Sequence, residues 1–302
     1  MEPRLTPFIL AMVALVGILW GLNWPTVKFL LREVPPLSLR AAGFTGGALV
    51  LLCIVKLLGH RLRPEPGEAR AIVIAGIFVV FGFNITTALG QTLTEASRAA
   101  IIAYTMPAIT AVLASVFLKE RLGWRRVLAV LIGMAGLGVL ASVDFAALVA
   151  APAGALFMLA AALSWSIGNV LVQARTWSLS PLALTLWFFV VSMVLAWPLA
   201  LWLEPQGLAR ALSAATWLVF GFHVAGPMAT CYLLWAVLLR RLPATVAAIS
   251  ILTAPTVGVL SAAYLLGEPL GWQKIVALGL IVLSIGITLI ARPKQPAVPD
   301  PA

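Results

Sequence analysis

Charged residues are scarce in this chain, at 10% of 302 residues, whereas hydrophobic residues make up 62%. Cysteine is almost absent. Cys53 and Cys231 have no neighbouring ligand cluster, which argues against a metal site or a redox pair. The chain contains no P-loop, no GxSxG nucleophile and no HExxH pair, which excludes an ATPase motor and two common hydrolase sites. We therefore expect no metal, no cofactor and no enzyme activity.

Long apolar runs take the place of charged segments. Runs near 20 residues recur along the chain, and that is the length a helix needs to cross a hydrocarbon core of ~30 Å. A β-barrel would instead show short alternating segments. We predict an all-α integral membrane protein with ten transmembrane helices. They lie near residues 7–27, 36–58, 70–91, 97–118, 124–141, 152–174, 181–203, 213–238, 244–266 and 272–291.

Lysine and arginine are unevenly distributed between the loops that these spans define. Fourteen fall on the side of the amino terminus and five on the other side. Because positive loops stay in the cytoplasm, we expect a multi-pass protein of the cell inner (plasma) membrane with both termini cytoplasmic. The net charge of +10 is then a topology signal. We expect a lipid bilayer around the protein and no nucleic-acid partner.

The chain contains an internal duplication. Residues 99–124 and 247–272 match at an offset of 148 with eleven identities, and Trp20 matches Trp165 at an offset of 145. We predict one five-helix repeat over residues 1–144 and a second over 150–292, followed by a short Pro-rich cytoplasmic tail at 293–302. Since five is odd, the second copy enters the membrane from the opposite side. Inverted repeats of this kind predict alternating access, with a site near the midplane.

The repeated segments support a family resemblance. The segments 118–124 (LKERLGW) and 266–272 (LGEPLGW), each following a proline helix, resemble the drug/metabolite transporter superfamily, and within it the bacterial ten-helix EamA-type exporters. The resemblance implies two five-helix halves, a small-molecule substrate and export of amino acids or other metabolites. It leaves the solute open, because the superfamily also carries sugar phosphates, nucleotide sugars and drugs.

Candidate substrate-cavity residues are the polar and aromatic side chains inside the predicted spans. Aromatic faces hold apolar or cationic groups, and amides can bind a carboxylate or an amine. For any single aromatic residue, simple packing is the alternative role. The candidates are Trp20, Asn23, Asn84, Tyr104, Trp165, Asn169, His223, Tyr232, Trp235 and Ser250.

Arg40 is the one lysine or arginine that falls clearly within a predicted span. A cation inside the membrane is costly, which makes it a functional candidate. Three roles are open for it. It can bind a substrate carboxylate, bind a helix carbonyl, or extend its side chain to the nearby membrane surface.

Four further residues are gating candidates. Pro107 and Pro255 occupy matched positions, and proline inside a helix removes a hydrogen bond and produces a kink. The kinks can act as pivots beside the substrate path or only shape the packing. Glu120 and Glu268 follow 13 residues later. They can form gate salt bridges or, as we favour, mark the membrane boundary.

These patterns predict an alternating-access transporter that exports small metabolites, most readily aromatic or neutral amino acids. All ten acidic residues fall in loops or at helix ends, so His223 is the sole intramembrane proton carrier that we identify. We therefore expect facilitative or weakly coupled transport. The alternatives are a proton-coupled exporter of drugs, sugars or nucleosides and, more remotely, an intramembrane enzyme or a receptor. Ten spans can enclose a cavity in one chain, so we expect a possible monomer.

Overall fold

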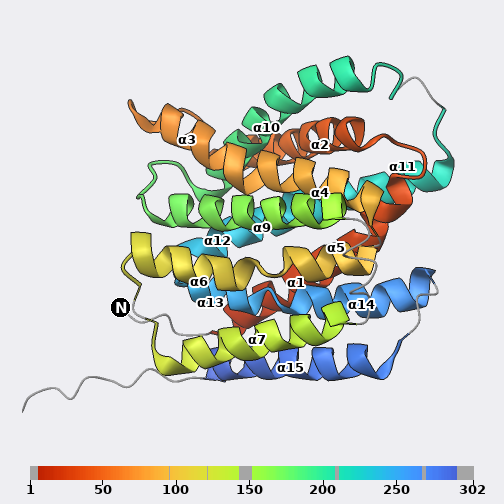
Figure 1. Ribbon diagram of the computed structural model, residues 1–302. Coiled ribbons are helices and arrows are strands. Elements are labelled where there is room, and N and C mark those ends of the chain that lie inside the picture. Colours follow the sequence, from red (N-terminus) through yellow and green to blue (C-terminus); the bar gives the residue numbers. More distant parts are fainter. Residues whose placement is uncertain are drawn as a thin grey trace, which may run out of the picture.

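The structure is a computed structural model that describes residues 6–94, 96–120, 122–142, 152–207, 211–266 and 270–290. The described residues form helices and no strands, which confirms the all-helical prediction for them. Figure 1 shows the helices side by side, with successive segments running in opposite directions. The first half contains α1 (Pro7–Leu30), α2 (Pro36–Leu57), α3 (Glu68–Gly76), η1 (Ile77–Gly82), α4 (Phe83–Leu93), α5 (Ala96–Ala103), α6 (Met106–Phe117) and α7 (Trp124–Ser142). The second half contains α9 (Pro152–Gln173), α10 (Pro181–Leu203), α11 (Ala214–His223), η2 (Val224–Thr230), α12 (Cys231–Arg241), α13 (Ala244–Ser250), α14 (Thr253–Leu266) and α15 (Trp272–Ile290).

The helix starts follow from local sequence. Proline occupies the first turn of α1, α2 and α10, where its missing N–H has no intrahelical partner. The Thr6 hydroxyl caps α1 and the Ser180 hydroxyl caps α10. The start of α2 is capped from a distant segment, because the Glu204 carboxylate accepts hydrogen bonds from the backbone N–H groups of Leu37 and Ser38.

The outer surface of the bundle is apolar. Seven helices of the described part are long and apolar enough to cross a membrane, and 106–117 and 272–287 are shorter apolar helices. Large hydrophobic side chains are widely exposed, among them Leu57, Trp202 and Leu218. So much exposed apolar surface suits lipid and would be unstable in water. The seven helices are Pro7–Leu30, Pro36–Leu57, Glu68–Leu93, Pro152–Gln173, Pro181–Leu203, Ala214–Arg241 and Ala244–Leu265.

Four of the predicted spans are less regular than expected. The π-helical segments η1 and η2 interrupt the third and eighth spans, and turns at 104–105 and 251–252 break the fourth and ninth. Pro107 and Pro255, which are predicted to kink the fourth and ninth spans, therefore lie just after a two-residue turn in each span. Each lies in the first turn of the helix that follows a break, where proline is tolerated because no hydrogen bond is lost.

Small residues bring α1 against α14. A methyl group added at Gly21 would lie 2.7 Å from the Ala254 carbonyl oxygen, and one at Gly17 would lie 1.9 Å from Thr253 Oγ1. Only glycine permits this backbone approach. The contact fixes α1, which carries several candidate site residues, against the broken span of the second half.

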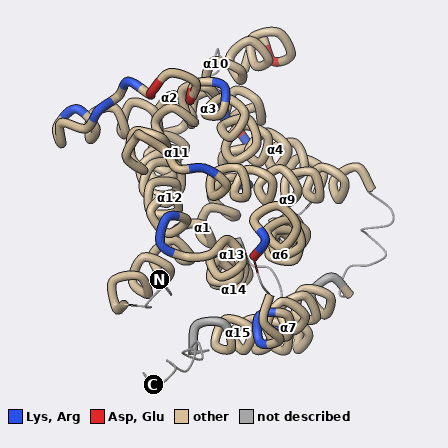
Figure 2. Tube along the Cα trace, turned by 90° about the vertical axis from the view of Figure 1, so that its left-hand side faces the viewer, with Lys and Arg blue, Asp and Glu red and all other residues tan. Residues whose placement is uncertain are grey.

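The two ends of the bundle differ in charge. The ends of α2, α6, α9 and α12 and the starts of α3, α7, α10 and α13 gather at the left of Figure 1, and Figure 2 views that end. Described basic residues near the opposite end are Lys28, Arg32 and Lys274. Those in or next to the first set of helix ends, by their positions in the sequence, are Lys56, Arg61, Arg63, Arg70, Lys119, Arg125, Arg126, Arg175, Arg240 and Arg241.

Candidate functional site

A cavity of about 40 Å³ lies between helices from both halves of the chain. This volume accommodates roughly two or three water molecules. A larger molecule requires the surrounding helices to separate. Six predicted residues line the cavity: Trp20, Asn23, Asn84, Tyr104, Trp165 and Tyr232. Five that were not predicted also line it: Trp24, Phe83, Met106, Met228 and Ile251.

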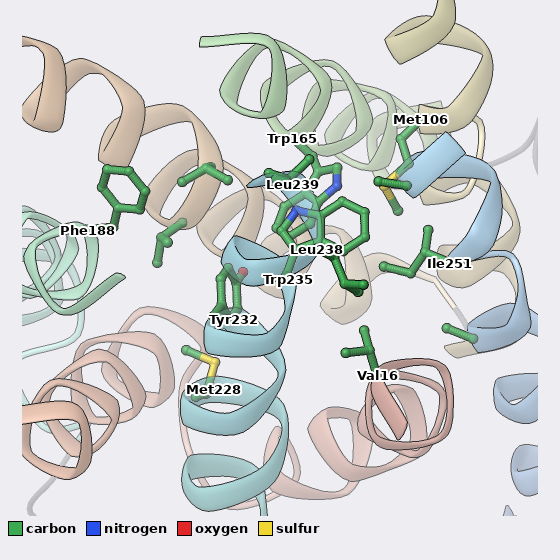
Figure 3. Packing of buried hydrophobic residues seen from close by; sticks show 14 of the residues in the cluster. Val16, Met106, Trp165, Phe188, Met228, Tyr232, Trp235, Leu238, Leu239 and Ile251 are labelled. Carbon is green, nitrogen blue, oxygen red and sulfur yellow. The ribbon is translucent and has the colours of Figure 1, made fainter. Parts of the chain in front are cut away.

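The two tryptophans that match across the duplication meet at this cavity. The Trp20 and Trp165 rings lie edge to face with centroids 5.2 Å apart, and each also contacts Tyr232. Figure 3 shows Trp165, Tyr232 and Trp235 gathered in this cluster. Trp20 Nε1 donates to the Pro227 carbonyl oxygen in η2 at 3.0 Å. Trp165 Nε1 is buried and has no hydrogen-bond partner among the described residues.

Asn84 and Tyr232 also match across the duplication, and they bind each other. Asn84 Nδ2 donates to Tyr232 Oη at 2.5 Å and to the Val80 carbonyl oxygen at 2.8 Å. Both side chains are buried. The bond joins α4 to α12 and makes one polar side of an otherwise aromatic cavity.

Asn23 forms a second polar contact. Its Oδ1 accepts a hydrogen bond from Nδ1–H of His223 at 2.7 Å. His223 Nε2 is buried without a hydrogen-bond partner in the described part of the chain. His223 itself does not line the cavity, because Asn23 stands between them.

Four other candidates lie outside the cavity lining: Arg40, Asn169, Trp235 and Ser250. Asn169 Oδ1 accepts from Trp235 Nε1 at 2.9 Å, and Trp235 packs on Trp20 and Trp165, so this pair supports the cavity wall from behind. Ser250 donates to the carbonyl of Val246 in its own helix. Arg40 is only 2% exposed, so its side chain does not extend to the surface.

The cavity residues that the sequence reasoning missed have recognisable positions. Trp24 pairs with Tyr104, with Nε1 3.5 Å from Oη, and Phe83 packs on Trp165 with ring centroids 4.9 Å apart. Trp24 matches Asn169 at the offset of 145, which is the signal that identifies it. Met106, Met228 and Ile251 carry no polar or aromatic signal.

The gating candidates lie at helix ends and breaks. Glu120 Oε1 accepts from Arg126 Nη1 at 3.0 Å, and Oε2 lies 3.4 Å from the backbone N of Thr245. Glu120 thus connects the end of α6 to α7 and α13. Pro107 and Pro255 are buried beside the two breaks. Glu268 and the tail at 293–302 lie outside the described residues.

A lysine and a glutamine at matched positions make equivalent contacts at opposite ends of the bundle. Lys28 Nζ, near the end of α1, donates to the carbonyl oxygens of Gln91 and Thr94 at 2.8 and 2.9 Å. Gln173, at the end of α9, matches Lys28 at the offset of 145. It donates to the carbonyls of Leu239 and Leu242 at 2.9 and 2.5 Å. These two leucines match the two acceptors of Lys28 at the offset of 148. We call the pair the Lys28 contact and the Gln173 contact, and each joins two helices that otherwise touch little.

Two glutamate–serine contacts also occupy matched positions, but the glutamate and the serine are swapped between them. Glu33 accepts from the backbone N–H and hydroxyl of Ser213 at the start of α11. Ser178 donates through the same two groups to Glu68. Glu33 matches Ser178, and Glu68 matches Ser213, at the offset of 145. The Ser213 N–H, followed by the hydroxyls of Thr216 and Ser213, holds the pKa of the Glu33 carboxyl below its ordinary value.

Comparison with known proteins gives a consistent result. The model of the EamA-like transporter family matches residues 7–142 and again 152–290. A chain of Archaeoglobus fulgidus named "uncharacterized transporter" is 24% identical, with 93% of this chain and 98% of that one covered. The "uncharacterized inner membrane transporter YedA" of Escherichia coli K12 is 26% identical, with 98% and 95% covered. A "probable amino-acid metabolite efflux pump" of Salmonella typhimurium is also 26% identical, with 91% and 92% covered.

A solved crystal structure shares the fold. It aligns with a TM-score of 0.74 at 22% identity, covering 93% of this chain and 98% of the other.

Proposed function

Because the chain belongs to the EamA-like transporter family, we propose that it is an alternating-access transporter that exports small metabolites, with amino acids as the solute class. The observation that carries this proposal is a cavity whose walls come from both halves of the chain. Its aromatic surfaces suit an apolar side chain, and its amides suit the polar end of an amino acid. A relative named a probable amino-acid metabolite efflux pump supports the same class.

The architecture we propose is ten transmembrane helices in two inverted repeats, 1–144 and 150–292. The family model matches each half separately. The matched Lys28 and Gln173 contacts, the Asn84–Tyr232 bond and the positions of η1 and η2 support the same correspondence. Halves of similar structure and opposite orientation allow two conformations in which they exchange roles.

In this mechanism the Lys28 and Gln173 contacts close the two ends of the path. A hydrogen bond contributes about 1 kcal/mol net when it is neutral, as at Gln173, and about 1.5–3 kcal/mol when the donor is charged, as at Lys28. The helices that each contact joins have little other packing to hold them. One end can therefore open while the other stays closed. The breaks at 104–105 and 251–252 contain the cavity residues Tyr104 and Ile251 and would serve as the hinges. Pro107, Pro255 and Glu120 hold the segments beside them.

We infer a location in the cell inner membrane, with both termini cytoplasmic and a monomer as the working unit. The basic end of the bundle would then face the cytoplasm, and the end with Lys28 and Arg32 would face outward. The lipid bilayer covers the exposed apolar surface.

Transport is proposed to be facilitative or only weakly coupled. The described acidic residues lie in loops or at helix ends, so no carboxylate among them can relay protons at mid-membrane. His223 favours the alternative of proton coupling, because it is buried next to the cavity residue Asn23. Substitution of His223 therefore distinguishes facilitative transport from proton-coupled transport.

The test is uptake of labelled aromatic and small neutral amino acids into proteoliposomes, with and without an imposed pH gradient. We expect saturable flux that ignores the gradient and falls at least about tenfold in Trp20→Ala, because the aromatic wall is lost. The control is Trp202→Ala, since Trp202 is exposed on the outer surface. Flux driven by the gradient and lost in His223→Gln would replace the facilitative proposal with proton coupling. Flux of drugs, sugars or nucleosides in the absence of amino-acid flux would change the solute class.

A further inference from the structure

Arg40 is a buried cation whose bonding capacity is largely unused. It lies in the second turn of α2, with 2% of the residue exposed. Nη2 donates to Thr87 Oγ1 at 3.3 Å, which is long for a hydrogen bond. Nε and Nη1 have no hydrogen-bond partner among the described residues. A guanidinium cannot lose its proton to escape this situation.

No described carboxylate neutralises Arg40. Of the two acidic residues near the start of α2, Glu204 binds the backbone N–H groups of Leu37 and Ser38, and Glu33 binds Ser213. Arg40 does interact electrostatically with Tyr232 and His223, but neither supplies a negative charge at neutral pH. A buried, unpaired charge is strongly unfavourable, so an anion from outside the chain would be bound with a large gain.

The position of Arg40 connects it to the cavity. Its partner Thr87 donates to the carbonyl of Asn84, and Asn84 lines the cavity and binds Tyr232. On the other side, Gly43, one turn after Arg40, faces His223 Nε2, since a methyl there would lie 3.4 Å from that nitrogen. Arg40 is therefore connected through Thr87 to Asn84 in the cavity wall, and the next turn of its helix faces His223.

We propose that Arg40 binds the carboxylate of the transported solute. The unpaired Nε and Nη1 each form one edge of the guanidinium together with Nη2, and either edge can bind the two oxygens of a carboxylate in a bidentate manner. The carboxylate reaches Arg40 when the helices separate and the Asn84–Tyr232 bond opens, while the apolar part of the solute stays against Trp20 and Trp165. The inference rests on the proposed function and makes it more specific, because it requires the solute to be a carboxylate.

The experiment compares phenylalanine with phenylalanine amide, which lacks the carboxylate, in proteoliposomes containing the full-length protein. Wild type should carry phenylalanine in strong preference. Arg40→Gln should reduce phenylalanine flux by about 100-fold and leave amide flux within about threefold, because only the carboxylate loses its partner. Arg32→Gln is the control, since Arg32 is an exposed cation near the same end. Equal loss of both fluxes, or no loss, in Arg40→Gln would overturn the proposal.

Thermal unfolding of the purified proteins separates binding from folding. Arg40→Gln should unfold at the same or a higher temperature than wild type, because an unpaired buried charge is removed. Phenylalanine should raise the unfolding temperature of wild type and not of Arg40→Gln. A variant that unfolds at a lower temperature and still responds to phenylalanine would show that Arg40 is structural.

Thermal unfolding tests the carboxylate site even if no flux is observed. Wild type that transports neither compound refutes the proposed function, but a shift with phenylalanine that needs Arg40 would still support the carboxylate site. No shift with phenylalanine would overturn it. An equal shift with sodium chloride at matched ionic strength would identify a free inorganic anion as the ligand and overturn the assignment to the solute.

Discussion

Asn84 and Tyr232 occupy corresponding positions in the two halves and join them at the cavity wall. Their bond is buried, so removing one partner leaves a polar group without water to replace it. In the proposed transport cycle, opening the cavity breaks this same contact. The pair therefore stabilises the closed arrangement and sets part of the free energy needed to open it.

Paired substitutions test that coupling. Tyr232→Phe and Asn84→Leu should each lower the free energy of unfolding by about 1–3 kcal/mol, and the double variant should lose less than the sum, with a coupling of about 1 kcal/mol. Thermal and denaturant unfolding of the proteins in detergent measure these losses and the coupling energy. Tyr104→Phe with Asn84→Leu is the control pair, because these side chains share no hydrogen bond in the described structure. Additive losses in the Asn84–Tyr232 cycle would contradict the account.

The two matched tryptophans should differ in their effect on stability. Trp20→Phe removes the bond to the Pro227 carbonyl and should cost about 1 kcal/mol more than Trp165→Phe, whose Nε1 has no partner among the described residues. Both changes leave a similar void, so each serves as the control for the other. Equal unfolding free energies for the two variants would show that the Trp20 bond contributes nothing.

At this scale the sequence points to the polar lining residues and to part of the aromatic lining, but not to Trp24, Phe83 or the apolar lining. Asn84 and Tyr104 stand out because a polar group inside a membrane span is energetically costly and is usually retained for a function. Met106 and Ile251 do not, because an apolar residue in an apolar helix looks the same whether it faces lipid, core or cavity. Asn169 and Trp235 were assigned to the cavity and instead bind each other one layer behind it.

At the scale of helices, hydropathy locates the spans and misses their interruptions. Predicted ranges such as 36–58 and 181–203 agree with α2 and α10 to within a residue. The segments η1 and η2, and the turns after α5 and α13, leave the composition apolar, so no hydropathy pattern reveals them. They depend on backbone geometry set by neighbouring helices.

The Lys28 and Gln173 contacts should bias the protein in opposite directions when removed. Lys28→Ala weakens the closure of one end, and Gln173→Ala weakens the other. With a cysteine introduced at cavity residue Met106 as reporter, the first variant should raise labelling from the Lys28 end, and the second from the basic end. Arg32→Ala should change neither rate. A shift in the same direction for both variants would contradict the two-ended mechanism.

The contribution of the Glu33–Ser213 contact to stability should depend on pH. Because hydrogen bonds lower the folded-state pKa of Glu33, its contribution to stability is present above the ordinary carboxyl pKa and is lost as the pH falls through the lowered value. Wild type should therefore unfold at a higher temperature than Glu33→Gln at neutral pH, and the difference should shrink in acid. A difference that stays constant down to about pH 3 would exclude the carboxylate as its source.

For the whole molecule, the duplication was readable because both copies retain identities at a fixed offset, and the matched contacts follow the same offsets. The sequence does not show which matched positions in the two halves make equivalent contacts. Glu33 is an acceptor and its match Ser178 is a donor, and Lys28 matches Gln173. Neither pair of matched positions has identical residues, so a search for identities does not find them. These relationships appear only when the helix ends are brought together in space.

The central claim is that one cavity opens alternately to the two sides of the membrane. The direct measurement is the reaction of a thiol at Met106, introduced as Met106→Cys with Cys53→Ser and Cys231→Ala, with a membrane-impermeant reagent applied from each side of oriented vesicles. We predict reaction from both sides, reduced by saturating phenylalanine, whereas a Leu57→Cys thiol at the exposed end of α2 should react from one side and ignore the solute. Reaction of the Met106→Cys thiol from one side only would contradict alternating access.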